Sequence, residues 1–537
     1  MTTATIAKKE PFKILICDDL SSEGLNLFNK EKNMSVSVKT KLPLEELKKE
    51  IADCDACVVR SATKLTREVI EAAKNLKVIG RAGVGLDNVD VEAASKKGII
   101  VMNTPGGNTI SAAEHTLSLM MAMARNIPMA DASTKRGEWE RKKFMGVELY
   151  EKTLGIMGLG RIGTEVAKRA QSFGMRVIAY DPYLRVEKAN QIGVEIVTLD
   201  ALLSQADYIT LHMPLSADNK YLIGEAALEK VKKGVRFINC ARGGLIDEAA
   251  LAKAIQSGKV AGAALDVFEN EPPKNSPLLT LPSVILTPHL GASTEEAQIA
   301  VAVDVAQSIV DYLMGRGVRN AVNVPSLDPE VMRELQPYIS LAEKLGSLLA
   351  QLIDGHICQV DINYHGEMVN YETTTMTVAL IKGLLTPILA ESVNYVNASV
   401  LAKERGIKIT ESKSTGVTSF SNLIQVDVKT DKKTSSVAGT LFTREDPRIV
   451  MIDSFDVEAV PEGYMLLIAN RDVPGIVGQV GTLLGENNIN IAGMTLGRDK
   501  PGGQAISLVK VDGHIPDKVM QEIKKAKNVL DAKLIKL

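Results

Sequence analysis

The sequence predicts an α/β protein with two doubly wound parallel-sheet domains, followed by an α+β domain and a small βαββαβ domain. In roughly the first 325 residues, short apolar runs alternate with amphipathic helical segments, which is typical of parallel sheets covered on both faces. A glycine-rich turn at 158–163 directly follows one apolar run. The segment 463–537 reads as strand, helix, two strands, helix and strand, which is the split βαβ arrangement.

Length and composition fit a multidomain globular protein. The chain has 537 residues, of which 45% are hydrophobic and 24% charged, so three or four separate cores are expected. A net charge of −2 gives no reason to expect a nucleic-acid or membrane partner. No apolar run reaches the ~18 residues of a membrane span. Residues 1–12 lack the apolar core of a signal peptide, so we expect a cytoplasmic protein.

Cysteine and histidine spacing indicates no metal site. Cys54 and Cys57 have the spacing of a redox or metal pair, but the run continues into Val58 and Val59 like a buried strand. No second cysteine pair lies nearby, and the six histidines are scattered. We therefore expect buried, inert thiols and no metal.

The first α/β unit has expected strands at 13–19, 35–38, 56–59, 78–79 and 99–101, and a long apolar helix at 109–127 follows it. A second helix, expected from Thr294 to Met314, is long and apolar enough to cross back to this unit. The first domain is therefore expected to be discontinuous, at 1–107 and 294–325, with a second domain at 108–293 inserted in it.

The stretch from Thr153 to Asp181 predicts a dinucleotide site. It reads as strand, Gly-x-Gly-x-x-Gly, helix, strand and acid. Gly158 permits the tight turn, Gly160 lets a pyrophosphate approach the backbone, and Gly163 lets the helix pack on the strand. Asp181 lies about 18 residues after Gly163, where its carboxylate can accept the ribose hydroxyls and repel a 2′-phosphate. This pattern favours NAD over NADP in a Rossmann-type domain.

Three strand ends in the inserted domain offer candidate catalytic side chains. Arg242 precedes two glycines, an acidic segment runs from Asp266 to Glu271 before two prolines, and His289 follows a buried strand at 284–287. Taken singly, each has a plainer interpretation: a surface arginine, a solvated acidic loop and a capping or core histidine. Together they supply what hydride transfer from a secondary alcohol needs, namely a base near neutral pH, a carboxylate to orient it and an arginine for the substrate acid group.

Two further domains are expected after the segment 323–329. Residues 326–457 mix helices, near 338–353 and 374–403, with strands at 357–364, 423–429, 437–442 and 449–453. They carry no nucleotide or catalytic motif. Residues 463–537 form the βαββαβ unit described above, whose small core makes pairing with a second copy plausible.

Four motifs carry a resemblance to a known family: Gly158–Gly163 with Asp181, Cys240–Gly244, Asp266–Pro272 and Pro288–Ala292. With these motifs the chain resembles the D-isomer-specific 2-hydroxyacid dehydrogenases, and within them the long phosphoglycerate-oxidising branch. That branch carries an intervening domain, here 326–457, and a C-terminal ACT regulatory domain, here 463–537. The resemblance spans nearly the whole chain and is most specific over residues 56–325.

The resemblance implies an NAD-dependent enzyme whose first domain binds the substrate. It places the catalytic roles on Arg242, Glu271 and His289. It places NAD contacts, beside the glycines and Asp181, on Arg161, Ile162, Met213, Cys240, Ala241, Arg242, Asp266, His289, Leu290, Gly291 and Ala292.

For the substrate, the resemblance implies 3-phospho-D-glycerate. Arg60 and Arg81, each after an apolar strand, suit a phosphate. Other substrate positions are Ser61, Val84, Gly85 and Asn108, and the basic run 141–143 could reach the phosphate from a neighbouring subunit. The alternatives are another D-2-hydroxyacid, such as glyoxylate, hydroxypyruvate or 2-oxoglutarate in the reducing direction, and an NAD-sensing scaffold without turnover.

For regulation and assembly, the resemblance implies a homodimer or homotetramer with L-serine as a candidate effector at the ACT domain. The effector positions fall on Asn470, Asp472 and Asn490. Some serine-sensitive relatives carry a histidine and an asparagine where this chain has Asn470 and Asp472, so an ACT domain that serves assembly alone is the alternative.

Overall fold

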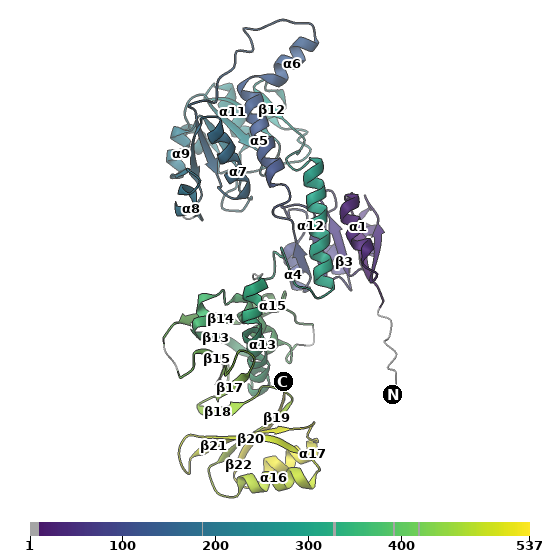
Figure 1. The fold of residues 1–537 in the computed structure, drawn as a ribbon, viewed down its shortest axis with the longest axis vertical. Coiled ribbons are helices and arrows are strands. Elements are labelled where there is room, and N and C mark those ends of the chain that lie inside the picture. Colours follow the sequence, from purple (N-terminus) through teal and green to yellow (C-terminus); the bar gives the residue numbers. More distant parts are fainter. Residues whose placement is uncertain (1–9, 185, 326–328, 390–391, 417–418) are drawn as a thin grey trace.

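The computed structural model describes residues 10–184, 186–325, 329–389, 392–416 and 419–537. It is an elongated molecule built from four sheets in series (Figure 1). The glycine-rich motif lies in the unit at one end and the last four-stranded sheet lies at the other. The expected α/β class and the C-terminal βαββαβ unit are confirmed. The expected domain boundary at residue 326 lies outside the described residues.

The first sheet is parallel, in the order β2-β1-β3-β4-β5. Its strands are β1 (Phe12–Ile16), β2 (Met34–Val38), β3 (Ala56–Val59), β4 (Val78–Arg81) and β5 (Ile100–Met102). Its helices are α1 (Ser22–Lys30), α2 (Leu44–Ile51), α3 (Arg67–Ala72) and α4 (Val91–Lys96).

Helix α12 (Glu295–Leu313) returns from the inserted unit to pack on this first sheet (Figure 1). Val305 and Ile309 of α12 share a core with Ile14 and Val78. The fit depends on Gly80, where an added Cβ would lie 2.5 Å from the Ile309 side chain. The residues directly before α12 belong to the unit of the second sheet. The first unit is therefore built from two separate pieces of the chain.

The second sheet has seven parallel strands in the order β12-β11-β10-β9-β6-β7-β8. These are β6 (Thr153–Met157), β7 (Arg176–Tyr180), β8 (Glu195–Ile196), β9 (Tyr208–Leu211), β10 (Val235–Asn239), β11 (Val260–Leu265) and β12 (Val284–Leu286). The helices around it are α5 (Thr109–Ala124), α7 (Arg161–Ser172), α8 (Val186–Asn190), α9 (Leu199–Gln205), α10 (Glu225–Lys230), α11 (Glu248–Gln256) and the 3-10 turn η1 (Pro277–Thr280).

The helix expected at 109–127 ends at Ala124, because Asn126 adopts a left-handed conformation with φ of 51°. A separate helix, α6 (Ile127–Lys135), then projects from the body of this unit (Figure 1).

The third sheet is mixed, in the order β14-β13-β15-β16-β17-β18. Its strands are β13 (Ile357–Gly366), β14 (Lys408–Ser414), β15 (Asn422–Thr430), β16 (Thr434–Leu441), β17 (Pro447–Ile452) and β18 (Phe455–Ala459). Its helices are α13 (Pro329–Leu352), the 3-10 turn η2 (Glu367–Asn370), α14 (Thr374–Leu385) and α15 (Ala398–Glu404). The single helix expected at 374–403 was therefore wrong: α14 stops at Leu385, two residues before Pro387, which cannot continue a helix.

Helices α13 and α14 cross at unusually close range. A Cβ added to Gly346 of α13 would lie 2.0 Å from the backbone oxygen of Leu380, and one added to Gly383 of α14 would lie 1.9 Å from that of Glu343. Each helix thus presents a glycine to the backbone of the other.

The fourth sheet is antiparallel, in the order β20-β21-β19-β22, with two helices. Its elements are β19 (Tyr464–Arg471), α16 (Ile476–Glu486), β20 (Ile491–Arg498), β21 (Gln504–Val511), α17 (Asp517–Lys525) and β22 (Val529–Lys536). Met465, Leu508 and Ile535 join the core of the preceding domain, and Lys533 Nζ donates to the Leu352 carbonyl at 2.8 Å. No helix in the described parts of the chain is long and apolar enough to cross a bilayer.

Candidate active site

The glycine-rich turn joins β6 to α7 in the conformation that a pyrophosphate site requires. Gly158 has φ of 92°, and a Cβ there would lie 2.7 Å from the His212 carbonyl. A Cβ on Gly163 would lie 2.2 Å from the carbonyl oxygen of Gly158, so helix and strand could not approach as they do. Gly160, in contrast, has no atom within 4 Å of its added Cβ, so the space above it at the start of α7 is open.

Asp181, at the end of β7, closes this turn. One carboxylate oxygen accepts the Leu159 amide at 2.9 Å, and the other accepts the amides of Tyr183 and Leu184 at 2.9 and 3.1 Å. These contacts fix the carboxylate beside the glycine turn. The open Gly160, the start of α7 and the placed acid together fit a dinucleotide.

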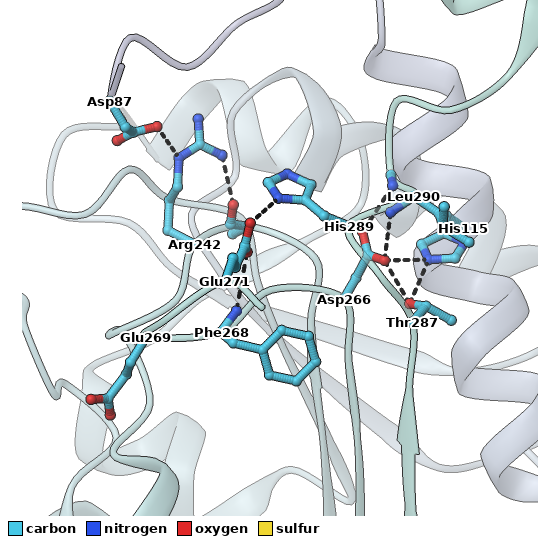
Figure 2. Close-up of polar contacts among 12 residues, drawn as sticks. Asp87, His115, Arg242, Asp266, Phe268, Glu269, Glu271, Thr287, His289 and Leu290 are labelled. Carbon is cyan, nitrogen blue, oxygen red and sulfur yellow. Dashed lines mark hydrogen bonds and ion pairs between the residues drawn. The ribbon is translucent and has the colours of Figure 1, made fainter. Parts of the chain in front are cut away.

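The side chains of the predicted base, His289, and the predicted acid, Glu271, are in contact. Nδ1 of His289 lies 2.9 Å from Oε2 of Glu271, and the backbone amide of Phe268 donates to Oε1 of Glu271 at 3.3 Å (Figure 2). His289 has a left-handed backbone, with φ of 56°. This contact leaves Nε2 of His289 available to a substrate.

The contact between His289 and Glu271 shifts the pKa of each side chain in the direction that favours its charged form. The hydrogen bond from Glu271 raises the pKa of His289, against burial, which lowers it. Burial raises the pKa of Glu271, but the hydrogen bond and charge of His289 outweigh it, so that pKa lies below its usual value. Glu271 therefore favours the protonated form of His289.

Asp266 holds the segment that carries His289. This carboxylate is fully buried and accepts the amides of Leu290 and Gly291 at 2.7 and 2.8 Å, as well as the Thr287 hydroxyl. His115 of α5 completes the group, with Nε2 at 3.1 Å from Asp266 (Figure 2). Burial raises the pKa of Asp266, but these donors outweigh it and keep the carboxyl ionised. The sequence alone predicts only that His115 lies in an apolar helix.

Arg242 connects the two α/β units. Its Nε lies 3.0 Å from Oδ2 of Asp87, in the loop after β4, and its Nη1 donates to the Ala241 carbonyl at 2.6 Å (Figure 2). A Cβ added to Gly85 would lie 1.9 Å from Nη2 of Arg242. The guanidinium thus lies against the substrate-side loop. The sequence alone predicts no role for Asp87.

Arg60 and Arg81 lie on the same side of the site as Asp87. Burial lowers the pKa of Arg81 to about 10, with smaller contributions from the positive charges of Arg242 and Arg60. The Nε of Arg81 is buried without a hydrogen-bond partner among the described residues. Three guanidinium groups therefore gather where a substrate with two anionic groups could compensate them.

The remaining expected positions fall around this centre. The Arg60 amide donates to Asp18 at 2.6 Å, and the Thr104 amide donates to Gly83 at 3.0 Å, which brings the loop containing Asn108 toward Val84 and Gly85. Oδ1 of Asn108 is buried without a hydrogen-bond partner among the described residues. Ser61, Met213, Cys240 and Ala241 follow strands β3, β9 and β10, while Arg161 and Ile162 begin α7 and Ala292 follows the His289 segment.

Within the described residues, no cluster of three or more His, Cys, Asp or Glu side chains could hold an ion. Cys54 and Cys57 are buried as expected, and burial raises the pKa of the Cys54 thiol to about 11.

The three expected effector residues are not brought together within one chain. Asn470 is buried and satisfied by Ser507 and the Arg471 carbonyl, and Asp472 accepts the Gly502 amide at 3.0 Å. Asn490 lies at the opposite end of the sheet, where it donates to Asp512 at 2.7 Å. The reason is the antiparallel register, which pairs Arg471 with Gln504 but Ile491 with Val511.

Comparison with known proteins decides the family. Residues 117–291 match the NAD-binding domain of D-isomer-specific 2-hydroxyacid dehydrogenases, residues 334–453 the D-3-phosphoglycerate dehydrogenase intervening domain, and residues 464–528 the ACT domain. The D-3-phosphoglycerate dehydrogenase of Methanocaldococcus jannaschii is 48% identical, over 98% of this chain and 100% of its own length. That of Bacillus subtilis is 44% identical, over the same shares of both chains.

The chain belongs to the D-3-phosphoglycerate dehydrogenase family. As a member, it is an NAD-dependent oxidoreductase. Among solved structures, the D-lactate dehydrogenase of Aquifex aeolicus, complexed with NAD and lactic acid, is 29% identical with a TM-score of 0.53. It covers 58% of this chain and all of its own chain. The additional length of this phosphoglycerate dehydrogenase family member therefore contains its intervening and ACT domains.

Proposed function

We propose that the protein oxidises 3-phospho-D-glycerate to 3-phosphohydroxypyruvate, the first step of the phosphorylated route to L-serine, with Arg242, Glu271 and His289 as its catalytic residues. The single observation that carries the proposal is the His289–Glu271 pair at 2.9 Å beside the guanidinium of Arg242. The full-length similarity to phosphoglycerate dehydrogenases supports the substrate.

His289 acts as the base. In its neutral form, Nδ1–H donates to Glu271, and Nε2 accepts the proton from the C2 hydroxyl of the substrate. Glu271 stabilises the imidazolium that results and keeps the ring oriented. NAD, held by the glycine-rich turn and Asp181, would supply the acceptor for the hydride that leaves C2.

Arg242 binds the carboxylate and the C2 oxygen of the substrate. A planar guanidinium can donate two parallel hydrogen bonds to a carboxylate. Its contact with Asp87 at 3.0 Å involves Nε and leaves Nη2 directed at the substrate-side loop. Substrate binding thus joins the two α/β units at the residue that already connects them.

The phosphate is assigned to Arg60 and Arg81, with Ser61, Val84, Gly85 and Asn108 as further donors. The partnerless Nε–H of Arg81, a free donor, supports this assignment. NAD is assigned to the turn Gly158–Gly163, Asp181, Met213, Cys240, Ala241, Asp266 and the segment His289–Ala292. The corresponding domains are 1–107 with 294–325 for the substrate, 108–293 for NAD, 326–457 as the intervening domain and 463–537 as the ACT domain.

The protein is further proposed to be a homodimer or homotetramer with L-serine as an effector. The segment around α6 supports assembly, since it projects from the NAD-binding unit (Figure 1). It also exposes large apolar side chains. These are Ile127, Trp139, Met145 and Tyr150. Residues 141–143 in this segment could then reach the substrate phosphate of a neighbouring copy. The separation of Asn470 from Asn490 supports an effector site that a second ACT domain would complete.

The test is NADH formation, followed by absorbance, with 3-phosphoglycerate and with unphosphorylated D-2-hydroxyacids, each with and without L-serine. The proposal requires a much larger kcat/KM for the phosphorylated acid. Equal or better turnover of lactate, glycerate or 2-hydroxyglutarate would assign another hydroxyacid, and no turnover would leave an NAD-binding scaffold. Sedimentation velocity of the same sample measures the assembly.

A further inference from the structure

A cavity of about 600 Å³ lies where the substrate-side α/β unit meets the intervening domain. Its size is within the range of small-molecule sites. Tyr312 and Val318 line it from the end of α12 and the chain that follows, and Ile339 and Val378 line it from α13 and α14. Most of the wall is apolar, and none of these residues belongs to the active site.

The wall of the cavity contains more positively charged than negatively charged side chains. Three arginines, Arg316, Arg319 and Arg333, face one carboxylate, Asp311. Arg319 pairs with Asp311, while Arg316 lies 3.9 Å from Asp311 and 3.4 Å from Glu31. Arg333 of α13 makes no ion pair with any residue that the structure describes. The cavity therefore carries uncompensated positive charge.

The hydroxyl group of Thr375 is a second, independent indication that this cavity binds a ligand. Thr375 lies in the first turn of the 12-residue helix α14, lines the cavity and is only 8% exposed. Its hydroxyl has no hydrogen-bond partner among the described residues. Buried polar groups are normally paired, and the start of a helix favours negative charge, so an anion would satisfy both features.

We propose that this cavity binds a small organic anion: a carboxylate or phosphate head group on an aliphatic or aromatic body. The arginines and the start of α14 match the head group, and the apolar wall matches the body. The site is separate from the residues proposed for catalysis and from Asn470, Asp472 and Asn490 in the ACT domain.

Occupancy would connect two domains. Arg316 and Arg319 belong to the end of the substrate-side unit, and Arg333 belongs to the intervening domain. Two polar contacts also hold this junction at the edge of the substrate-side unit: Asn394 donates to the Gly98 carbonyl at 2.9 Å, and Lys96 pairs with Glu404 at 2.7 Å. An anion between arginines of both domains would restrict their relative movement.

The test uses the full-length protein with saturating NAD, so that the dinucleotide site is filled. The probe is 8-anilinonaphthalene-1-sulfonate, an anion with an aromatic body, titrated by fluorescence and displaced with phenylacetate or with phenyl phosphate. We expect saturable binding that both competitors reduce, and their relative affinities distinguish a carboxylate site from a phosphate site. Probe fluorescence that does not saturate, or that neither competitor reduces, overturns the proposal.

Substitutions in the wall of the cavity test whether the probe binds there. Arg333→Gln should weaken probe binding by about tenfold, because one charged donor is lost. Thr375→Val, which keeps the side-chain shape, should weaken it less. Arg444→Gln removes an exposed arginine elsewhere in the intervening domain and should leave binding unchanged. Equal affinity in wild type and Arg333→Gln, or equal losses in Arg333→Gln and Arg444→Gln, would refute a site at this junction.

Discussion

Gly85 and Arg242 lie so close together that a single methyl group on the glycine would meet the guanidinium, at 1.9 Å from Nη2. The two residues are far apart in the sequence and belong to different α/β units. Their contact, with the Asp87 ion pair beside it, sets the position of the arginine proposed to bind the substrate carboxylate.

Gly85→Ala should therefore reduce kcat/KM for 3-phosphoglycerate by about 100-fold, since Arg242 must move to admit the methyl group. The end of an arginine side chain moves readily, so folding and NADH binding should remain. Steady-state kinetics and NADH fluorescence titration measure both. Gly493→Ala, whose added methyl has nothing within 4 Å, is the control and should behave as wild type.

Glu271→Gln should change the pH profile as well as the rate. Glu271 raises the pKa of His289, and oxidation requires the neutral imidazole, so the wild-type rate rises with pH through that raised pKa. Without the carboxylate, the pKa falls, and the acidic limb of kcat/KM should move to lower pH. The plateau should drop about 100-fold or more, since the imidazolium loses its partner.

Glu269→Gln is a matched control for this change. Glu269 lies two residues away, and its side chain points away from His289 (Figure 2). The Tyr221 hydroxyl donates to it at 3.0 Å. Its pH profile should coincide with that of the wild type. An unshifted acidic limb in Glu271→Gln would mean that another group is titrating.

Arg81→Ala should weaken binding of the substrate phosphate. Loss of a charge-assisted hydrogen bond should raise KM for 3-phosphoglycerate by about 10- to 100-fold. Activity with an unphosphorylated hydroxyacid should change little, and Arg67→Ala on the exposed face of the same domain should alter neither substrate. Parallel losses with both substrates would assign Arg81 to the carboxylate or to the domain structure instead.

The sequence predicted what is encoded locally. Apolar runs ending in Arg242, Glu271 and His289, and the turn from Gly158 to Gly163, can be recognised because strand ends and glycine spacing are local patterns. Asp87 and His115 were missed because their roles depend on contacts with Arg242 and Asp266, each more than 100 residues away. Strand β14 was missed because its residues are mostly polar and exposed, without the alternation of a half-buried strand.

Gly346→Ala should destabilise the intervening domain. Alanine is the better helix former by about 1 kcal/mol, but the methyl would lie 2.0 Å from the Leu380 backbone oxygen, and overpacking of this kind typically costs about 1–3 kcal/mol. We expect a lower midpoint for the unfolding transition of this domain in a thermal scan. Gly481→Ala in α16, with nothing within 4 Å, should be neutral or stabilising, and a loss as large in that variant would point to a general effect of the substitution.

Glu248 should act on catalysis from outside the site. Its carboxylate accepts the Glu269 amide at 2.8 Å and the Ser276 hydroxyl, so it fixes both ends of the loop that carries Glu271. Glu248→Ala should loosen this loop and weaken the contact between Glu271 and His289. We expect kcat to fall about tenfold and the acidic limb of the pH profile to move downward, in the same direction as for Glu271→Gln.

Glu248→Gln separates positioning from general stability. Its side-chain oxygen can still accept the Glu269 amide, and its NH₂ group can donate to the Ser276 hydroxyl, so most activity and the wild-type pH profile should be retained. A merely structural role would lower the unfolding temperature of Glu248→Ala without moving its pH limb. That result would show that Glu248 does not act on catalysis through Glu271 and His289.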